Sequence, residues 1–124
     1  MDPMEVLPVR FHFGGQFDFD GYSVNYVRGR VDISHIERDK LSLPKLRGFL
    51  CDHVNLEVED VVEFYWLPPG ADMNNDLRKL EDDQSCRYMS DCVTVDGVAE
   101  VYCHIYKLAA LNVRQLMERL PRAA

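Results

Sequence analysis

The chain has 124 residues, of which 47% are hydrophobic and 28% are charged, and its formal net charge is −7. This length predicts one domain that buries roughly two-thirds of the surface its unfolded chain would expose. The composition excludes a disordered chain, and no apolar run approaches the ~20 residues of a spanning helix, which excludes a membrane-spanning protein.

The charge is unevenly distributed along the chain. Residues 57–100 contain 3 Lys/Arg and 12 Asp/Glu, a net charge of −9, whereas residues 101–124 carry a net charge of +3. An acidic block repels phosphate and argues against a nucleic-acid footprint, which needs a basic face. Such a block can instead attract a basic protein surface. The charge distribution therefore favours a protein partner over nucleic acid.

The start of the chain and its cysteines indicate the cellular compartment. Residues 1–5 lack the basic and apolar regions of a secretory signal, which predicts an intracellular protein with free thiols. The 4 cysteines and 4 histidines show neither a Cys-x-x-Cys motif nor a paired-ligand spacing. The sequence therefore predicts no metal and no cofactor, and buried cysteines that act as small hydrophobic residues.

The first strand is predicted by apolar residues that alternate with basic ones. Arg10 and His12 lie on one face of this extended segment. The opposite, buried face carries Val9, Phe11 and Phe13. Gly14 and Gly15 can adopt positive φ, so the chain can turn back there.

A second strand is expected after a loop over residues 16–21. Its alternation begins at Tyr22, is interrupted by a bulge or bend at residues 28–30, and resumes through Ile33. Arg28 and Arg30 would lie near its end. Residues 36–41 then form a charged, solvated connection.

A helix of about three turns is predicted to start after Ser42 and to cover one face of the sheet. Pro44 suits its first turn because the missing N–H costs nothing there. The apolar positions at helical spacing are Leu43, Leu46, Phe49, Leu50 and Val54. Gly48 costs roughly 1 kcal/mol in helix propensity relative to Ala, and we expect a close approach to a strand to explain it.

The later elements are predicted from shorter signals. Residues 61–67 are apolar on both faces and predict a covered strand, which the prolines at 68 and 69 end. Leu77 and Leu80 indicate a short strand, and residues 83–90 one or two helical turns with Cys86 and Met89 turned inward. Asp96-Gly97 indicates a hairpin. One face of the last strand would carry Ala99, Val101, Cys103 and Ile105.

The C-terminal residues change character. Apolar residues near helical spacing predict a helix from about residue 109 to residue 120, which Pro121 ends. This amphipathic helix is expected either to pack on the sheet or to form a hydrophobic seam between two copies. The seam residues would be Leu111, Leu116 and Leu120.

The order of these elements is that of an α+β, ubiquitin-like β-grasp fold. It has a mixed four- to five-stranded sheet and one main helix, followed here by a C-terminal helix. The first and last strands would lie side by side and parallel at the centre of the sheet. A ferredoxin-like sandwich is the main competitor, but it needs a second long helix, and residues 83–90 are too few.

Several segments together resemble a known family. They are residues 9–15 (VRFHFGG), 36–44 (IERDKLSLP), 67–70 (LPPG), 89–91 (MSD) and 96–101 (DGVAEV). This combination looks like the PB-one-like domain (Phox and Bem-one type) that stands at the N-terminus of plant Mutator-like transposase proteins. The resemblance predicts such a domain over residues 1–106 and a separate helical tail over residues 107–124.

The resemblance implies an interaction module rather than an enzyme, and a nuclear location. The better-known Phox and Bem-one domains associate front to back, with a basic first-strand residue of one copy meeting an acidic segment of another. Matched onto this chain, the basic face is Arg10, Arg28 and Arg30. The acidic segment is Glu81, Asp82, Asp83 and Asp91. The chain departs from the family pattern in having Arg where Lys is usual on the first strand and in the irregular spacing of its acidic residues.

Several functional hypotheses follow. The leading one is a module that binds itself or a heterologous protein through opposed charged faces, which requires the arginines to lie apart from the chain's own carboxylates. A second is a homodimer or scaffold assembled through the C-terminal helix. A nucleic-acid-associated accessory domain is opposed by the acidic block, although it is favoured by Arg28, Arg30, Arg38, Lys40, Lys45 and Arg47. An enzyme is disfavoured because Cys103 and His104 are strand neighbours that point to opposite faces.

Overall fold

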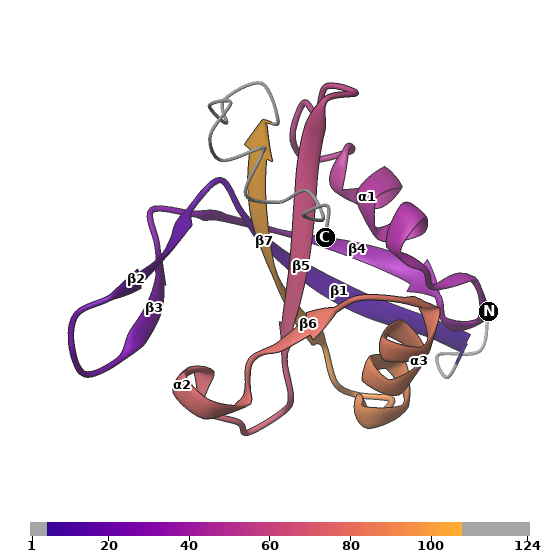
Figure 1. Ribbon diagram of the computed structural model, residues 1–124. Coiled ribbons are helices and arrows are strands. Elements are labelled where there is room, and N and C mark those ends of the chain that lie inside the picture. The colour runs from indigo at the N-terminus through magenta and orange to yellow at the C-terminus, as the bar shows by residue number, and fades with distance from the viewer. Residues whose placement is uncertain (1–4, 108–124) are drawn as a thin grey trace, which may run out of the picture.

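The computed structural model describes residues 5–107, which form a five-stranded mixed sheet, a separate two-stranded hairpin and helices packed against the sheet (Figure 1). The strands are β1 (Val6–Phe13), β2 (Gln16–Phe19), β3 (Val24–Val27), β4 (Arg30–Glu37), β5 (Asp60–Leu67), β6 (Arg78–Leu80) and β7 (Ala99–Lys107). The helices are α1 (Leu43–Leu50), α2 (Met73–Asp76) and α3 (Asp83–Cys92), with a 3₁₀ turn at Arg38–Lys40.

The sheet has the strand order β4-β1-β7-β5-β6. At its centre β1 and β7 run parallel, pairing residues 9–12 with residues 99–102. All other neighbouring strands of this sheet are antiparallel. A central parallel pair made from the first and last strands, with antiparallel flanks and a helix across one face, is the ubiquitin-like β-grasp arrangement. The structure thus confirms the α+β fold expected from the sequence.

The hydrophobic core lies between one face of the sheet and the helices α1 and α3. Alternate residues of β1 are buried there, as the period-two pattern predicts. Leu46 and Leu50 of α1, and Cys86 and Met89 of α3, are fully buried in the same core. Figure 1 shows α1 and α3 on the same side of the sheet. The helices therefore leave the opposite face of the sheet uncovered.

Helix α1 starts as predicted but is shorter. The Ser42 hydroxyl accepts a hydrogen bond from the Lys45 N–H at 3.2 Å. After Leu50 the backbone tightens into a turn in which the His53 N–H donates to the Leu50 C=O at 2.9 Å. The helix therefore has 8 residues rather than about three turns, and the turn that follows it brings His53 to Ser34 of β4. A Cβ added to Gly48 would meet no atom within 4 Å, so the expected close approach to a strand is wrong.

The segment after β1 differs most from its prediction. Residues 16–19 are a strand rather than a loop, and β2 pairs with β3 in a sheet of its own. The predicted bent strand is therefore two strands in different sheets, separated at Arg28, which has a φ of 64°. Gly29 follows because a Cβ there would lie 2.5 Å from the ring of Tyr26. β4 then pairs antiparallel with β1.

The second half of the chain follows its local signals with two exceptions. β5 ends at Leu67, before the two prolines, and β6 and α3 form where they were expected. Asp96-Gly97 makes a turn, with the Gly97 N–H donating to the Thr94 C=O at 2.9 Å, but not a hairpin. Since α3 continues to Cys92, no strand precedes that turn. The other exception is the charged connection, where Arg38 is partly buried rather than solvated.

Two further expectations concern the membrane and the tail. Between residues 5 and 107, no helix combines the length and the apolar character needed to cross a lipid bilayer. The predicted helix over residues 109–120, with Leu111, Leu116 and Leu120, lies outside the described residues.

Candidate protein-interaction surfaces

Arg10 lies on the face of the sheet opposite the helices, here called the open face. Its Nη1 atom donates to Oε2 of Glu100 at 2.6 Å, and Nε2 of His12 lies 2.9 Å from Oε1 of the same carboxylate. Strand register explains the contact, because Arg10 of β1 and Glu100 of β7 are direct partners in the parallel pair. The charge of Arg10 is therefore balanced within the chain rather than free for a partner.

Arg28 and Arg30 do not join Arg10. Arg30 pairs in register with Phe13, and its guanidinium carbon lies 5.1 Å from the centroid of the Phe13 ring. Phe13 points into the core, so Arg30 is on the side of the sheet opposite Arg10. Arg28 is exposed in the connection between β3 and β4. The structure thus does not assemble the three arginines into the single basic face that the sequence suggested.

The predicted acidic residues are brought together in part. Glu81, Asp82 and Asp83 are exposed where β6 leads into α3, and we call these three residues the acidic corner. Asp91 is exposed 8 residues after Asp83, about 12 Å further along α3. Asp82 also caps α3, since its Oδ1 accepts the Ser85 N–H at 2.8 Å.

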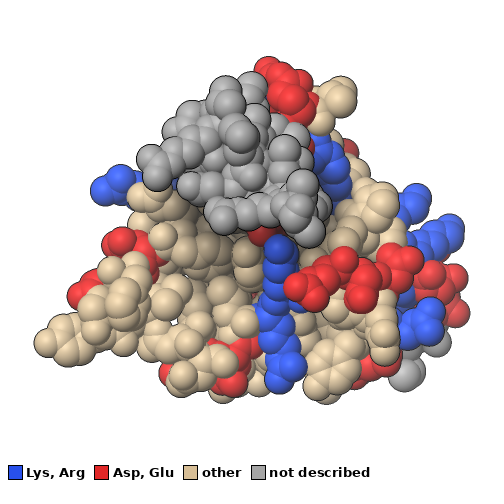
Figure 2. Space-filling view, viewed as in Figure 1, with Lys and Arg blue, Asp and Glu red and all other residues tan. Residues whose placement is uncertain are grey.

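The acidic corner keeps its charge unpaired. Among residues 5–107, no Lys, Arg or His side chain forms an ion pair with any of its three carboxylates. The nearby Lys79 is bound to Glu63 at 2.9 Å, and Arg78 lies over the ring of Tyr88. Figure 2 shows acidic side chains gathered over the connection between β6 and α3, beside a strip of basic side chains.

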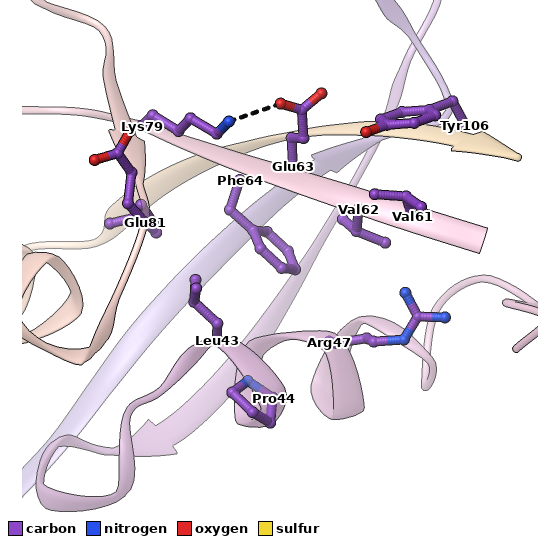
Figure 3. A pocket seen from close by; sticks show the side chains of 11 residues that line it. Leu43, Pro44, Arg47, Val61, Val62, Glu63, Phe64, Lys79, Glu81 and Tyr106 are labelled. Carbon is purple, nitrogen blue, oxygen red and sulfur yellow. Dashed lines mark ion pairs between the residues drawn. The ribbon is translucent and has the colours of Figure 1, made fainter. Parts of the chain in front are cut away.

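A groove of about 630 Å³ follows β5 between α1 and β6. Its lining residues include Leu43 and Arg47 of α1, residues 61–64 of β5, and Glu81. β6 pairs only with residues 64–66, so the outer edge of residues 60–63 has no strand partner within the described part of the chain. Figure 3 shows Phe64 and Val62 on the side of β5 that faces Leu43 and Pro44 of α1, whereas the ion pair between Glu63 and Lys79 lies on the other side of the strand with Tyr106.

The hairpin of β2 and β3 is fastened to the sheet by an aromatic cluster. The Tyr26 hydroxyl donates to the Cys103 C=O at 2.8 Å and accepts the Gly15 N–H at 3.0 Å. The Phe17 ring meets the rings of Tyr26 and Tyr65 edge on, at 5.2 and 5.4 Å between centroids. Burial raises the pKa of the Tyr26 phenol. The hairpin therefore covers part of the open face with neutral side chains.

A Ser–His–Asp chain that no sequence motif indicated lies between β4 and the end of α1. Nε2 of His53 is 2.7 Å from Oγ of Ser34, and Nδ1 of His53 is 3.2 Å from Oδ2 of Asp32. The atoms are connected as in a serine hydrolase triad. The Ser34 residue is only 7% exposed, however, so its hydroxyl offers little access to an acyl substrate.

All four cysteines are free thiols, of which Cys86 and Cys103 are buried and Cys92 is half-buried. Burial raises the pKa of the Cys86 thiol to about 11 and also raises the pKa of Cys103. Neither is a thiolate at neutral pH, whereas Cys51 is exposed. In residues 5–107, no three His, Cys, Asp or Glu side chains gather into a metal site.

The central parallel pair, the antiparallel flanks and the core-facing helices define a ubiquitin-like β-grasp domain with charged surfaces. A model of the PB1-like domain family matches residues 3–105, and the chain belongs to that family. PB1-like domains mediate protein–protein interactions, so the family indicates a protein partner. Comparison with curated proteins and with solved structures finds no significant match.

Proposed function

We propose that this domain binds a basic surface of a protein partner through the acidic corner. Membership of the PB1-like family supports a protein partner. The observation that carries the choice of surface is that Glu81, Asp82 and Asp83 are adjacent and exposed, without an ion pair to any residue in 5–107. Arg10, by contrast, already has the Glu100 carboxylate.

Unpaired carboxylates suit recognition for a physical reason. Adjacent like charges create a local negative potential, which speeds encounter with a basic partner and disfavours an acidic one. Close charge pairs formed across an interface can couple by roughly 1.5–7 kcal/mol. A partner cation at the acidic corner gains such pairs without breaking one inside the domain. An acidic group that approached Arg10 would have to compete with Glu100.

A second copy of the chain is a specific candidate partner. Arg28 and Arg30 are exposed, and neither forms an ion pair with a carboxylate among residues 5–107. In a front-to-back assembly these two arginines would meet the acidic corner of the next copy. This version differs from the sequence-based hypothesis because it assigns no contact to Arg10.

Sedimentation velocity at low and high salt tests self-association. The variants are Glu81→Lys/Asp83→Lys, which reverses the acidic corner, and Arg28→Glu/Arg30→Glu, which reverses the arginines. We expect the wild-type chain to associate at low salt and each variant alone to be monomeric. An equimolar mixture of the two variants should associate again, because one retains the arginines and the other the acidic corner. Variants that associate as strongly as the wild type would refute the front-to-back contact.

Affinity capture tests a heterologous partner. Three baits are compared: the wild type, Glu81→Lys/Asp83→Lys, and Asp39→Lys/Asp52→Lys. The third makes the same change in net charge at two exposed sites on other segments, the 3₁₀ turn after β4 and the turn after α1. A partner that binds the wild type and the control but not the acidic-corner variant supports the proposal. A partner that all three baits retain to the same extent argues against this surface.

The resemblance supports further proposals about origin and location. We propose that the domain derives from a plant Mutator-like transposase, acts in the nucleus and has no catalytic activity of its own. Imaging of the tagged chain tests the location. A titration with duplex DNA at low salt tests the nucleic-acid alternative. Because the domain is acidic, we expect no binding, whereas binding that weakens steeply with added salt would support that alternative.

A further inference from the structure

We propose that the C-terminal segment of this chain, residues 108–120, docks in the groove beside β5. The groove presents two features that a docked segment would cover. Its walls include the apolar side chains of Leu43, Val62 and Phe64, and its floor includes the edge of β5 at residues 61–63, which has no strand partner among the described residues. An exposed strand edge next to apolar side chains is a site of unwanted association unless something covers it.

The path of the chain favours its own C-terminal segment as the occupant. β7 ends at Lys107, which is the direct register partner of Asp60 at the start of β5. Nζ of Lys107 lies 2.8 Å from Glu57 and 3.2 Å from Asp60, so the described chain ends beside the first residue of β5, across that strand from the groove. Thirteen residues span about 20 Å as a helix, and the edge from residue 60 to residue 64 is about 14 Å long.

The chemistry of the segment matches that of the groove. Its apolar residues are Leu108, Leu111, Val113, Leu116, Met117 and Leu120. The charged residues that line the groove balance one another, Arg47 and Lys79 against Glu63 and Glu81, so the apolar side chains carry the match.

The covalent link to the domain favours docking of the chain's own C-terminal segment over docking of the same segment from a second copy. A short flexible linker gives an effective concentration in the millimolar range, well above the concentration of free chains in a dilute solution. Docking within one molecule therefore prevails over a hydrophobic seam between two molecules. This inference does not depend on which partner the acidic corner binds.

Photo-crosslinking of the full-length chain tests the proposal. A benzoylphenylalanine replaces Glu81, which lies on the groove, and in a matched control it replaces Val31, which is 54% exposed on β4. An equal mixture of ¹⁴N- and ¹⁵N-labelled protein separates crosslinks within a molecule from those between molecules. We expect position 81, but not position 31, to crosslink to residues 108–120 within one molecule.

The double variant Leu116→Asp/Leu120→Asp provides the second comparison. It should reduce the crosslink at least tenfold and speed trypsin cleavage after Arg114 and Arg119 at least tenfold, while the domain still unfolds in one cooperative urea transition. The midpoint of that transition should be lower than in the wild type, because a segment that docks only on the folded domain stabilises it. Crosslinks that join ¹⁴N to ¹⁵N molecules would overturn the proposal in favour of a seam between copies. An absence of crosslinks to residues 108–120, or equal crosslinking from both positions, would also overturn it.

Discussion

Substitution of Ser34 by Ala distinguishes a structural from a catalytic role for the Ser–His–Asp chain. Removal of the hydroxyl leaves Nε2 of His53 without the partner that it has at 2.7 Å. The imidazole is largely enclosed, with 13% of its side chain exposed, so water replaces that partner poorly. An unsatisfied buried polar group costs about 1–3 kcal/mol. We therefore expect Ser34→Ala to lower the free energy of unfolding by that amount.

Urea denaturation followed by the fluorescence of Trp66 measures this loss, since Trp66 is the only tryptophan and is buried. Asp32→Asn is the matched comparison, because the Asp32 carboxylate is 58% exposed and its ion pair with His53 is worth less than about 1 kcal/mol. Hydrolysis of p-nitrophenyl acetate and labelling by a fluorophosphonate probe should be the same for the wild type and Ser34→Ala. A structural role would be refuted if the probe labels Ser34 in the wild type and if Ser34→Ala loses the hydrolytic activity but keeps the wild-type stability.

Three other substitutions test the anchoring of the β2–β3 hairpin, the helix propensity of α1 and the hydrogen bonds of Arg38. Tyr26→Phe should lower the free energy of unfolding by about 1–3 kcal/mol and speed amide exchange in β2 and β3, and unchanged exchange would contradict the anchoring of the hairpin. Burial raises the pKa of Tyr26, so its stabilising effect is complete below the unfolded pKa of about 10 and is lost as pH rises through the folded pKa. Alkaline denaturation of Tyr26→Phe should therefore show a weaker pH dependence than that of the wild type. Gly48→Ala should raise the free energy of unfolding by about 1 kcal/mol, since an added Cβ meets no atom within 4 Å, and a lower urea midpoint would show a clash. Arg38→Gln removes the guanidinium that donates to the carbonyl groups of Ser90 at 2.5 Å and Val93 at 3.2 Å. Hydrogen bonds from a charged donor contribute about 1.5–3 kcal/mol, and a variant with the wild-type midpoint would show that the contact contributes nothing.

The interaction surfaces were only partly predictable from the sequence. The acidic corner could be found because its residues are consecutive and lie in an acidic block. The pairing of Arg10 with Glu100 could not be found, because the two residues are 90 positions apart and meet through the register of a parallel pair. His53 reaches Ser34 because the chain turns after α1, and neither residue belongs to a motif.

Local sequence features alone determined several secondary-structure elements of this protein. The alternation in β1, the Ser42 cap of α1 and the end of β5 before Pro68 are set by residues a few positions apart. Tertiary structure alone decided that β2 and β3 form a separate hairpin, and that Arg10 is paired while the Glu81 carboxylate has no ion pair within residues 5–107. The physical reason is that strand register places distant charges together, and only that placement determines which of them remain available to a partner.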